Sequence, residues 1–519
     1  IDRNGLVLAS TQPAVAVTAD PTLTRDRAPE IAEIVSRHLQ MPPAELTELL
    51  TRQGTHFVYL KKRVPALTYS ALATELSSRK IYGVFREADP VRAYPGKTVG
   101  SSVIGFVGAD GQGLGGLERR YNTELAGVEG EQTFESAPNG SRIPLGESET
   151  KPARNGMNYR LTLDSEVQWA AERLVEARVR DLGADSGFAI VIDVRTGELL
   201  ALANAPGFDP NQPKKSDKPN LGNRAVSEPY EPGSVQKVLT AAALIDSGTA
   251  TPETKVEVPR RLKSNDRFIK DHFPHEADIL KLNLRGIMAR SSNIGTAILA
   301  RQMPLESLYD YLTRFGLGSR TGIELPGESR GILATPEKMA EGQRDQIAFG
   351  QALAVTGVQQ AAAVASVING GVYHAPTVIR GVTDAEGREV PVEHEPPRRV
   401  ISEQASAQVR DLMGAVVESE NGQKALKLDG YTSGGKTGTA ERADPDCRCY
   451  RGYVTSFVGF APVDDPRVLT YVVINNPKAA QSGSGSAAPV YKDLMKLVLP
   501  RYSVAPDARP LANRPTEWE

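Results

Sequence analysis

The spacing of hydrophobic residues changes part of the way along the chain, and this change predicts a domain boundary. Before it, short amphipathic segments alternate with stretches rich in glycine and proline. They predict short helices at 43–52 and 69–79 and a loop leading into a helix at 106–127. A polar, turn-rich stretch at 139–156 follows. We therefore assign residues 1–158 to a first domain of mixed α and β structure.

After the boundary, longer apolar runs predict the strands of one sheet. The runs at 187–194 and 198–205 are joined by a short turn and predict a hairpin. The runs at 453–462 and 467–476 predict a second hairpin, and 436–440 predicts a strand just before it. Strands at both ends with helices between them favour an antiparallel sheet flanked by helices, an α+β fold, over alternating βαβ units.

Helices border these strands in the sequence. The pattern over 165–182 predicts a long helix, at whose start we expect Ser165 and Gln168 to form a capping box. A further helix closes this second domain, which we assign to residues 159–502. The last residues, 503–519, are rich in proline and poor in apolar side chains, which predicts a mobile tail.

Composition is that of an ordinary globular protein of more than one domain. Among 519 residues, 40% are hydrophobic and 24% charged, and the net charge of −2 gives no reason to expect a nucleic acid partner. No apolar run approaches the roughly 18 residues of a membrane span, and no signal peptide begins the chain. The sequence starts abruptly, as if inside a domain.

Three short motifs, read in order, supply candidate catalytic chemistry. Each is weak alone, since Ser-x-x-Lys also occurs from Ser77, Ser148 and Ser433. The order of all three is the arrangement of serine acyltransferases that use a lysine base. The candidate residues are Ser234 and Lys237 in PGSVQK, Ser291 and Asn293 in SSN, and Lys436, Thr437, Gly438 and Thr439 in KTGT.

Local context separates Ser234 from the other serines. Pro232 and Gly233 break the chain before it, and the apolar run VLTAAALI follows Lys237. Ser234 is therefore expected at a helix N-terminus, where backbone N–H groups favour developing negative charge. The spacing of three places Lys237 on the same helix face.

The chemistry needs a lysine that is neutral near pH 7. Burial and a neighbouring cation both lower the pKa of an amine, and we expect both for Lys237, with Lys436 as the cation. Ser291 is expected to relay the proton to a leaving amine, and Asn293 to bind a substrate amide. The backbone N–H groups of Ser234 and Thr439 are candidates for an oxyanion hole.

The strand 436–440 is the expected binding edge for an extended peptide. Thr437 and Thr439 carry hydroxyls that suit a carboxylate. No cofactor and no metal is expected: His272, His275 and Glu276 lie in a polar insertion without a clear further ligand and are interpreted as a surface loop.

The cysteines, Cys447 and Cys449, are separated by one residue. A disulfide between them is close to the limit of reach in an extended strand and feasible in a loop. Disulfide and free thiols remain equally open at this point.

These motifs, with four longer stretches, make the chain resemble a class B penicillin-binding protein, a monofunctional peptidoglycan D,D-transpeptidase. Residues 2–9 resemble the family's membrane-proximal opening and 92–118 its pedestal motif. Residues 189–211 resemble the first hairpin of the transpeptidase domain, and 349–371 the long helix region before KTG. The compact pedestal and the lack of C-terminal accessory modules resemble division-type enzymes, and the richness in Arg, Ala and Gly resembles actinobacterial members.

The resemblance implies a mechanism, partners and a location. Ser234 would attack a stem peptide ending in D-Ala-D-Ala, a neighbouring stem's amine would take the acyl group, and β-lactams would acylate the same serine. The pedestal, 1–158, would bind a polytopic membrane glycosyltransferase and other division proteins. A short cytoplasmic segment and one transmembrane helix would precede Ile1, placing the catalytic domain outside the membrane. Val235 stands where the family most often has threonine, which removes a possible hydrogen bond.

Three alternatives share the motifs. A class A β-lactamase needs a further carboxylate to activate water, which the sequence does not identify, and has no use for a pedestal. A β-lactam sensor needs only acylation. A D,D-carboxypeptidase differs only in using water as acceptor. The sequence leaves open the acceptor amino acid, the cellular role and the oligomeric state.

Overall fold

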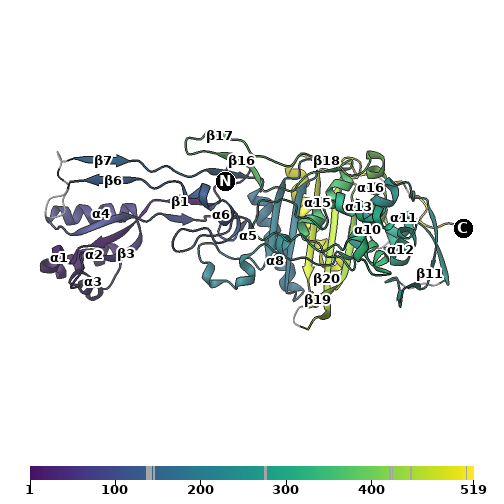
Figure 1. The fold of residues 1–519 in the computed structure, drawn as a ribbon, viewed down its shortest axis with the longest axis horizontal. Helices are drawn as coiled ribbons and strands as arrows, with labels where there is room; N and C mark the ends of the chain where they lie inside the picture. The colour runs from purple at the N-terminus through teal and green to yellow at the C-terminus, as the bar shows by residue number, and fades with distance from the viewer. Residues whose placement is uncertain are drawn as a thin grey trace.

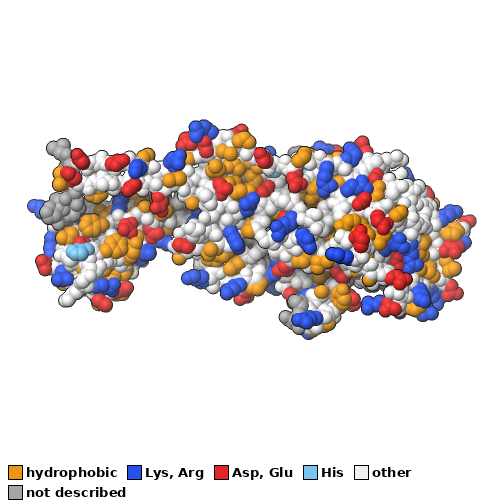
Figure 2. All heavy atoms as spheres, in the orientation of Figure 1, with side chains coloured by type: hydrophobic (Ala, Val, Ile, Leu, Met, Phe, Trp, Pro, Cys, Tyr) orange, Lys and Arg blue, Asp and Glu red, His pale blue; other side chains and the backbone are white. Residues whose placement is uncertain are grey.

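The computed structural model describes residues 1–135, 143, 147–273, 277–419, 422, 425–444, 447–509, 511–512 and 514–519. The molecule is elongated, with the first domain at one end and the second domain at the other (Figure 1). Acidic and basic side chains are interspersed over both domains on the face that Figure 2 shows, in keeping with the small net charge. None of the described helices is both long enough and apolar enough to cross a membrane.

The far end of the first domain has a hydrophobic core of its own. A three-stranded antiparallel sheet, in the order β3-β2-β4, packs against three helices. The buried side chains include Val17 from the sheet and Ile31, Leu46 and Leu72 from the helices. The predicted helices at 43–52 and 69–79 correspond to α3 and α4. The elements are β2 (Ala14–Ala19), β3 (Val58–Pro65), β4 (Val84–Ala88), α2 (Ala28–Leu39), α3 (Pro43–Leu50) and α4 (Ala66–Ser78).

The rest of the first domain connects this core to the second domain. The single helix expected at the end of 106–127 is two short helices. The break between them falls at Tyr121. Ahead of both helices, glycines let two backbone segments meet, since a Cβ on Gly105 would lie 1.7 Å from the Gly115 carbonyl oxygen. The elements are α5 (Ser101–Ile104), α6 (Gly116–Arg120), α7 (Asn122–Ala126) and the hairpin of β6 (Glu131–Phe134) and β7 (Ser148–Lys151).

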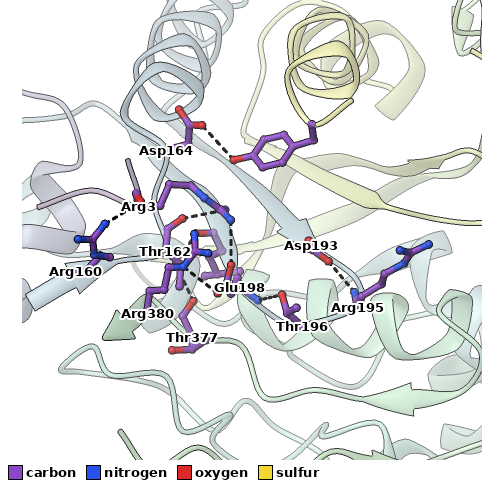
Figure 3. Close-up of polar contacts among 12 residues, drawn as sticks. Arg3, Arg160, Thr162, Asp164, Asp193, Arg195, Thr196, Glu198, Thr377 and Arg380 are labelled. Atoms are coloured by element: carbon purple, nitrogen blue, oxygen red, sulfur yellow. Dashed lines mark hydrogen bonds and ion pairs between the residues drawn. The ribbon is translucent and has the colours of Figure 1, made fainter. Parts of the chain in front are cut away.

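The first residues of the chain are tied to the second domain (Figure 3). The Arg3 guanidinium donates to the carbonyl of Thr162 at 3.3 Å and lies 3.2 Å from the Glu198 carboxylate, which Arg380 approaches to 4.0 Å. Ile1 adds a backbone pairing, because its carbonyl accepts from the N–H of Leu161 at 2.9 Å. The first residues of the chain are thus bonded to segments of the second domain that lie far from them in the sequence.

The second domain is built on one five-stranded antiparallel sheet, in the order β10-β9-β21-β20-β19. The α8 and α19 helices cover one face. The α15 and α16 helices pack on the other, with α10 against both of them (Figure 1). This arrangement confirms the predicted α+β fold and both predicted hairpins. The strands are β9 (Ser186–Asp193), β10 (Leu199–Ala205), β19 (Gly434–Asp444), β20 (Cys449–Ala461) and β21 (Val468–Asn475).

The helices of this domain form its flanking layers, and two of the three catalytic motifs lie at helix ends. They are α8 (Ser165–Asp181), α10 (Gln236–Asp246), α11 (Leu284–Arg290), α12 (Asn293–Ala300), α13 (Leu305–Arg314), α14 (Gln343–Ala348), α15 (Gly357–Ile368), α16 (Glu403–Glu418) and α19 (Ala488–Arg501). The sheet and these helices share one continuous hydrophobic core.

The predicted capping box at the start of α8 is wrong. Asp164 is the N-cap, and its carboxylate accepts from the N–H groups of Glu166 and Val167. Gln168 turns instead to the edge strand β10, where its amide accepts from the N–H of Leu202 at 2.7 Å and donates to the carbonyl at 3.2 Å. The glutamine thus supplies the pairing that an edge strand lacks.

The segment 503–519, whose composition predicts a mobile tail, contains described residues that are hydrogen-bonded to the second domain. The Asp507 carboxylate accepts from the Thr432 N–H at 2.8 Å, and Trp518 Nε1 donates to the carbonyl of Leu282 at 3.2 Å. The contacts depend on a few residues and on backbone pairing, which average composition does not reveal.

Glu172 of α8 is a buried carboxyl at the contact with the first domain, and its titration can be tested. Its carboxylate accepts from the N–H of Gly100 at 2.8 Å, and burial raises its pKa to about 7. Between its ordinary pKa and about 7, the folded protein holds a proton that the unfolded chain has lost, so stability falls as pH rises. We expect Glu172→Gln to remove about 1–2 kcal/mol of this loss between pH 5 and pH 8.

Denaturant unfolding at pH 5 and pH 8 measures the effect. Glu257→Gln, at an exposed position on a surface strand, is the control and should keep the pH dependence of the wild type. An unchanged pH dependence in Glu172→Gln would show that this carboxyl does not titrate abnormally.

Candidate active site

The turn that carries Ser234 is held by backbone atoms on both sides. Gly233 adopts φ +54°, and its N–H donates to the carbonyl of Gly350 at 3.0 Å. On the other side, a Cβ added to Gly233 would lie 2.6 Å from the Thr439 carbonyl oxygen. The turn η4 (Gly233–Val235) then runs into α10, so the structure places Ser234 at the helix start, as predicted.

Lys237 is fully buried one turn further along. Its Nζ lies 2.6 Å from the carbonyl oxygen of Ser291, 2.7 Å from Asn293 Oδ1 and 3.1 Å from Ser234 Oγ. A neutral lysine has two N–H donors and one lone pair. The carbonyl and the amide oxygen can only accept, so they take both donors and leave the lone pair for the Ser234 hydroxyl.

The SSN motif reaches this amine because the chain reverses between two helices. Ser291 ends α11 in the left-handed region, at φ +58°, and Asn293 opens α12. Ser292 is the N-cap of α12, and its hydroxyl donates to the Asp271 carboxylate at 2.8 Å. That carboxylate also accepts from the Ile294 N–H at 3.0 Å, so Asp271 holds the start of α12 in place.

Lys436 arrives from β19 and is also fully buried. Its Nζ lies 2.8 Å from Ser291 Oγ, while Lys237 Nζ lies 3.2 Å from the same oxygen. One hydroxyl therefore bridges the two amines, which is the geometry a proton relay needs.

The environment lowers the pKa of both amines. Burial lowers the pKa of Lys436 to about 7. Burial lowers the pKa of Lys237 well below its ordinary value, the charge of Lys436 lowers it further, and Asp271 opposes the shift. Because the charge of Lys436 adds to the effect of burial, Lys237 is the amine that loses its proton more readily, and Lys436 is the one closer to keeping its own.

Thr437, Gly438 and Thr439 lie on β19 beside the nucleophile turn. They pair with Phe457, Ser456 and Thr455 of β20, which leaves the outer edge of β19 as the edge of the sheet. Gly438 permits this approach, because a Cβ there would lie 2.2 Å from Ser456 Oγ and 3.0 Å from the Pro232 carbonyl oxygen. An edge strand next to a nucleophile is suited to pairing with an extended peptide.

The structure thus joins five of the predicted residues, Ser234, Lys237, Ser291, Asn293 and Lys436, in one hydrogen-bonded cluster, with the other three on the adjacent strand. Sequence reasoning missed Asp271 and Gly350, which lie far from the motifs in the chain. Over the part of the chain that the structure describes, no group of three or more His, Cys, Asp or Glu side chains is arranged to hold a metal ion. Of the histidine cluster, His275 and Glu276 lie outside the described residues.

The two cysteines form a disulfide at the turn between β19 and β20. Their Cα atoms lie 5.2 Å apart, and Arg448 between them adopts φ +52°. This left-handed residue brings the sulfur atoms together, which an extended strand does not do. The question that the spacing left open is therefore answered in favour of the disulfide.

Two domain families match the chain. The penicillin-binding protein dimerisation domain matches residues 1–161, and the penicillin-binding protein transpeptidase domain matches residues 187–496. The penicillin-binding protein PbpB of Mycolicibacterium smegmatis is 32% identical, over 98% of this chain and 84% of its own length. The peptidoglycan D,D-transpeptidase FtsI of Escherichia coli is 30% identical, over 98% of this chain and 84% of its own.

Solved structures agree with this match. A peptidoglycan synthetase from Bifidobacterium adolescentis superposes with a TM-score of 0.81 at 28% identity, covering 100% of this chain and 97% of that one. Penicillin-binding protein 3 of Mycobacterium tuberculosis, complexed with aztreonam, gives 0.73 at 32% identity, covering 82% and 93%.

The two amines predict the pH dependence of Ser234 acylation by a penicillin. The rate should fall at low pH, where Lys237 gains a proton and loses its lone pair, and should fall again above about 7, where Lys436 loses the charge that attracts the drug's carboxylate. Stopped-flow acylation between pH 5 and pH 10 measures this profile. A rate that rises steadily towards pH 10 would mean that Lys237 titrates as an ordinary lysine.

Gly350 should be essential to the nucleophile turn. It has φ +93°, and a Cβ there would lie 1.9 Å from the Gly233 carbonyl oxygen. We expect Gly350→Ala to displace the turn, to lower stability by at least ~2 kcal/mol and to slow penicillin acylation more than tenfold.

Gly370→Ala is the matched control, since Gly370 has φ +96° and a Cβ there would meet nothing within 4 Å. It should lose only the roughly 1 kcal/mol of a left-handed residue and acylate normally. Equal acylation rates in the two variants would show that the close approach to Gly233 is unimportant.

Proposed function

The chain belongs to the class B penicillin-binding proteins, which join a dimerisation domain to a transpeptidase domain, and we propose that it crosslinks peptidoglycan stem peptides with Ser234 as the nucleophile. The class makes it a serine-type D,D-transpeptidase. The observation that carries the assignment of residues is the contact of Lys237 Nζ with Ser234 Oγ at 3.1 Å, with both donors of the amine engaged elsewhere.

In the first step, Ser234 Oγ attacks the carbonyl of the penultimate D-Ala while its proton passes to Lys237. The carbon–nitrogen bond to the last D-Ala then breaks. Ser291 Oγ, in contact with both amines, delivers the proton that the leaving nitrogen needs, and is reprotonated from Lys237. The products are an acyl-serine and free D-Ala, and Lys237 is neutral again.

Charge that develops on the carbonyl oxygen is assigned to the backbone N–H groups of Ser234 and Thr439. The terminal carboxylate of the donor is assigned to Thr437 and Thr439, with Lys436 behind them as the cation. Asn293, whose Nδ2 donates to the carbonyl of Lys270 at 3.1 Å, is assigned to a backbone amide of the substrate.

In the second step, the side-chain amine of a neighbouring stem attacks the acyl-serine. Its nitrogen loses a proton to the Ser291 and Lys237 pair, Ser234 Oγ takes one back, and the crosslink forms. A β-lactam carries out only the first step, because its ring opens without releasing a leaving group, which supports the same serine as the drug target.

We further propose a role in septal cell-wall synthesis, and a membrane anchor with the catalytic domain outside the membrane, because the substrate that the name of FtsI states, peptidoglycan, lies outside the cell membrane. We assign the partner-binding surface to the pedestal, residues 1–158, and the partners to a polytopic glycosyltransferase and other division proteins. The separate core of this domain supports a binding module that folds around its own side chains.

Intact mass after brief exposure to benzylpenicillin tests the nucleophile. The wild type should gain one long-lived drug mass and Ser234→Ala none. Ser148→Ala removes the serine of an exposed Ser-x-x-Lys pair and should gain the full adduct. No adduct in the wild type, or an adduct that persists in Ser234→Ala, would refute the assignment.

Reaction with a stem pentapeptide and an amine acceptor tests the reaction. Crosslinked product supports the transpeptidase. Release of D-Ala without crosslinks would indicate a carboxypeptidase, rapid release of hydrolysed drug a β-lactamase, and acylation without any peptide reaction a sensor.

A further inference from the structure

A cleft of about 580 Å³ opens beside the turn that carries Ser234. Its walls come from β9, from the segment before the nucleophile, from residues 352–354 and from the end of β19. Two of its lining residues lie close to the catalytic motifs in the sequence. Glu231 comes just before the nucleophile turn, and Glu441 comes just after Thr439. The cleft therefore continues the substrate groove along β19. Its apolar lining consists of Phe188, Tyr230, Ile332, Leu353, Val454 and Val473.

The basic side chains that line the cleft already have acidic partners. Arg224 lies 2.6 Å from the carboxylate of Glu228, and Arg442 lies 3.5 Å from that of Asp444. They are therefore largely neutralised within the fold and leave little positive charge for a ligand.

Two carboxylates in the same cleft lack such a partner. Among the residues that the structure describes, neither Glu231 nor Glu441 lies within ion-pair distance of a basic group. Glu231 Oε1 accepts from the N–H of Ala352 at 3.0 Å and from the Tyr450 hydroxyl at 3.2 Å, which fixes the carboxyl at the cleft mouth. Burial raises the pKa of Glu231, and the charge of Glu441 raises it further. A cation placed between Glu231 and Glu441 would stabilise both carboxylates in their charged form.

The chemistry of the site sets the direction of a bound donor. The terminal carboxylate is assigned to Thr437 and the reacting carbonyl to the space between Ser234 and Thr439. Successive groups of the donor therefore run along β19 towards Glu441. Two residues of a strand span about 7 Å, so the residue that precedes the penultimate D-Ala lies beside Glu441 and the cleft mouth.

We propose that this cleft binds the side chain of the donor residue immediately before D-Ala-D-Ala, and that Glu231 and Glu441 recognise a primary ammonium at its end. The methylene groups of a diamino acid would pack on Tyr230 and Leu353. The inference rests on the proposed function and deepens it: the enzyme selects donors whose side-chain amine is free, and disfavours stems whose amine has already been acylated by a crosslink.

Two synthetic donors test this subsite: acetyl-Lys-D-Ala-D-Ala with a free side-chain amine, and the same peptide with that amine acetylated. The readout is the ratio of their kcat/KM values for D-Ala release in the presence of an amine acceptor. We expect the wild type to favour the free amine by roughly tenfold, and Glu231→Gln and Glu441→Gln each to reduce the ratio to about two or less.

Glu257→Gln is the control, because Glu257 is an exposed acid outside the cleft, and it should keep the full preference. Glu441 is exposed, so its substitution tests the proposal even where Glu231→Gln lowers stability. Equal rates for the two donors in the wild type, or a preference that survives in both cleft variants, would overturn the subsite. Failure of the proposed function has a different signature, which is the absence of Ser234 acylation by penicillin in the wild type.

Discussion

The burial of two lysine amines around a single hydroxyl is the constraint on which the catalytic domain depends. Charged amines are costly to bury without a carboxylate, and the fold offers Lys237 a carbonyl and an amide oxygen in place of one. These partners satisfy its N–H groups but bring no full negative charge to balance a protonated amine. Burial therefore favours the neutral amine, which is the state a base for Ser234 requires.

The surrounding structure holds this cluster through its backbone more than through its side chains. Ser291 has to adopt a left-handed conformation to face both amines, and Asp271 fixes the helix that follows it. Gly233 and Gly350 let two chain segments meet behind the nucleophile at distances that any side chain would prevent. The precision of the site is thus a property of close backbone packing.

The three motifs, each weak alone, predicted the cluster through their order, and the local signal of Pro232 and Gly233 separated Ser234 from the other serines. The sheet was also predictable from apolar periodicity. Gly350 and Asp271 were not, since their roles come from contacts between segments far apart in the sequence. The cap of α8 was misassigned because Gln168 bonds to a strand instead of to its own helix. Only the left-handed conformation of Arg448 decides the disulfide, and no residue pattern fixed that angle in advance.

The backbone clamp on the nucleophile turn has a consequence for selection by antibiotics. Gly233 and Gly350 contribute no side chains, and a side chain at either position would displace the turn that carries Ser234. Such a substitution would impair the reaction with the substrate together with the reaction with the drug. Mutations that slow the reaction with a β-lactam but preserve cell-wall synthesis are therefore restricted to the side chains that line the groove. Resistance in such an enzyme would accumulate along the flanks of β19, and the turn itself would stay unchanged.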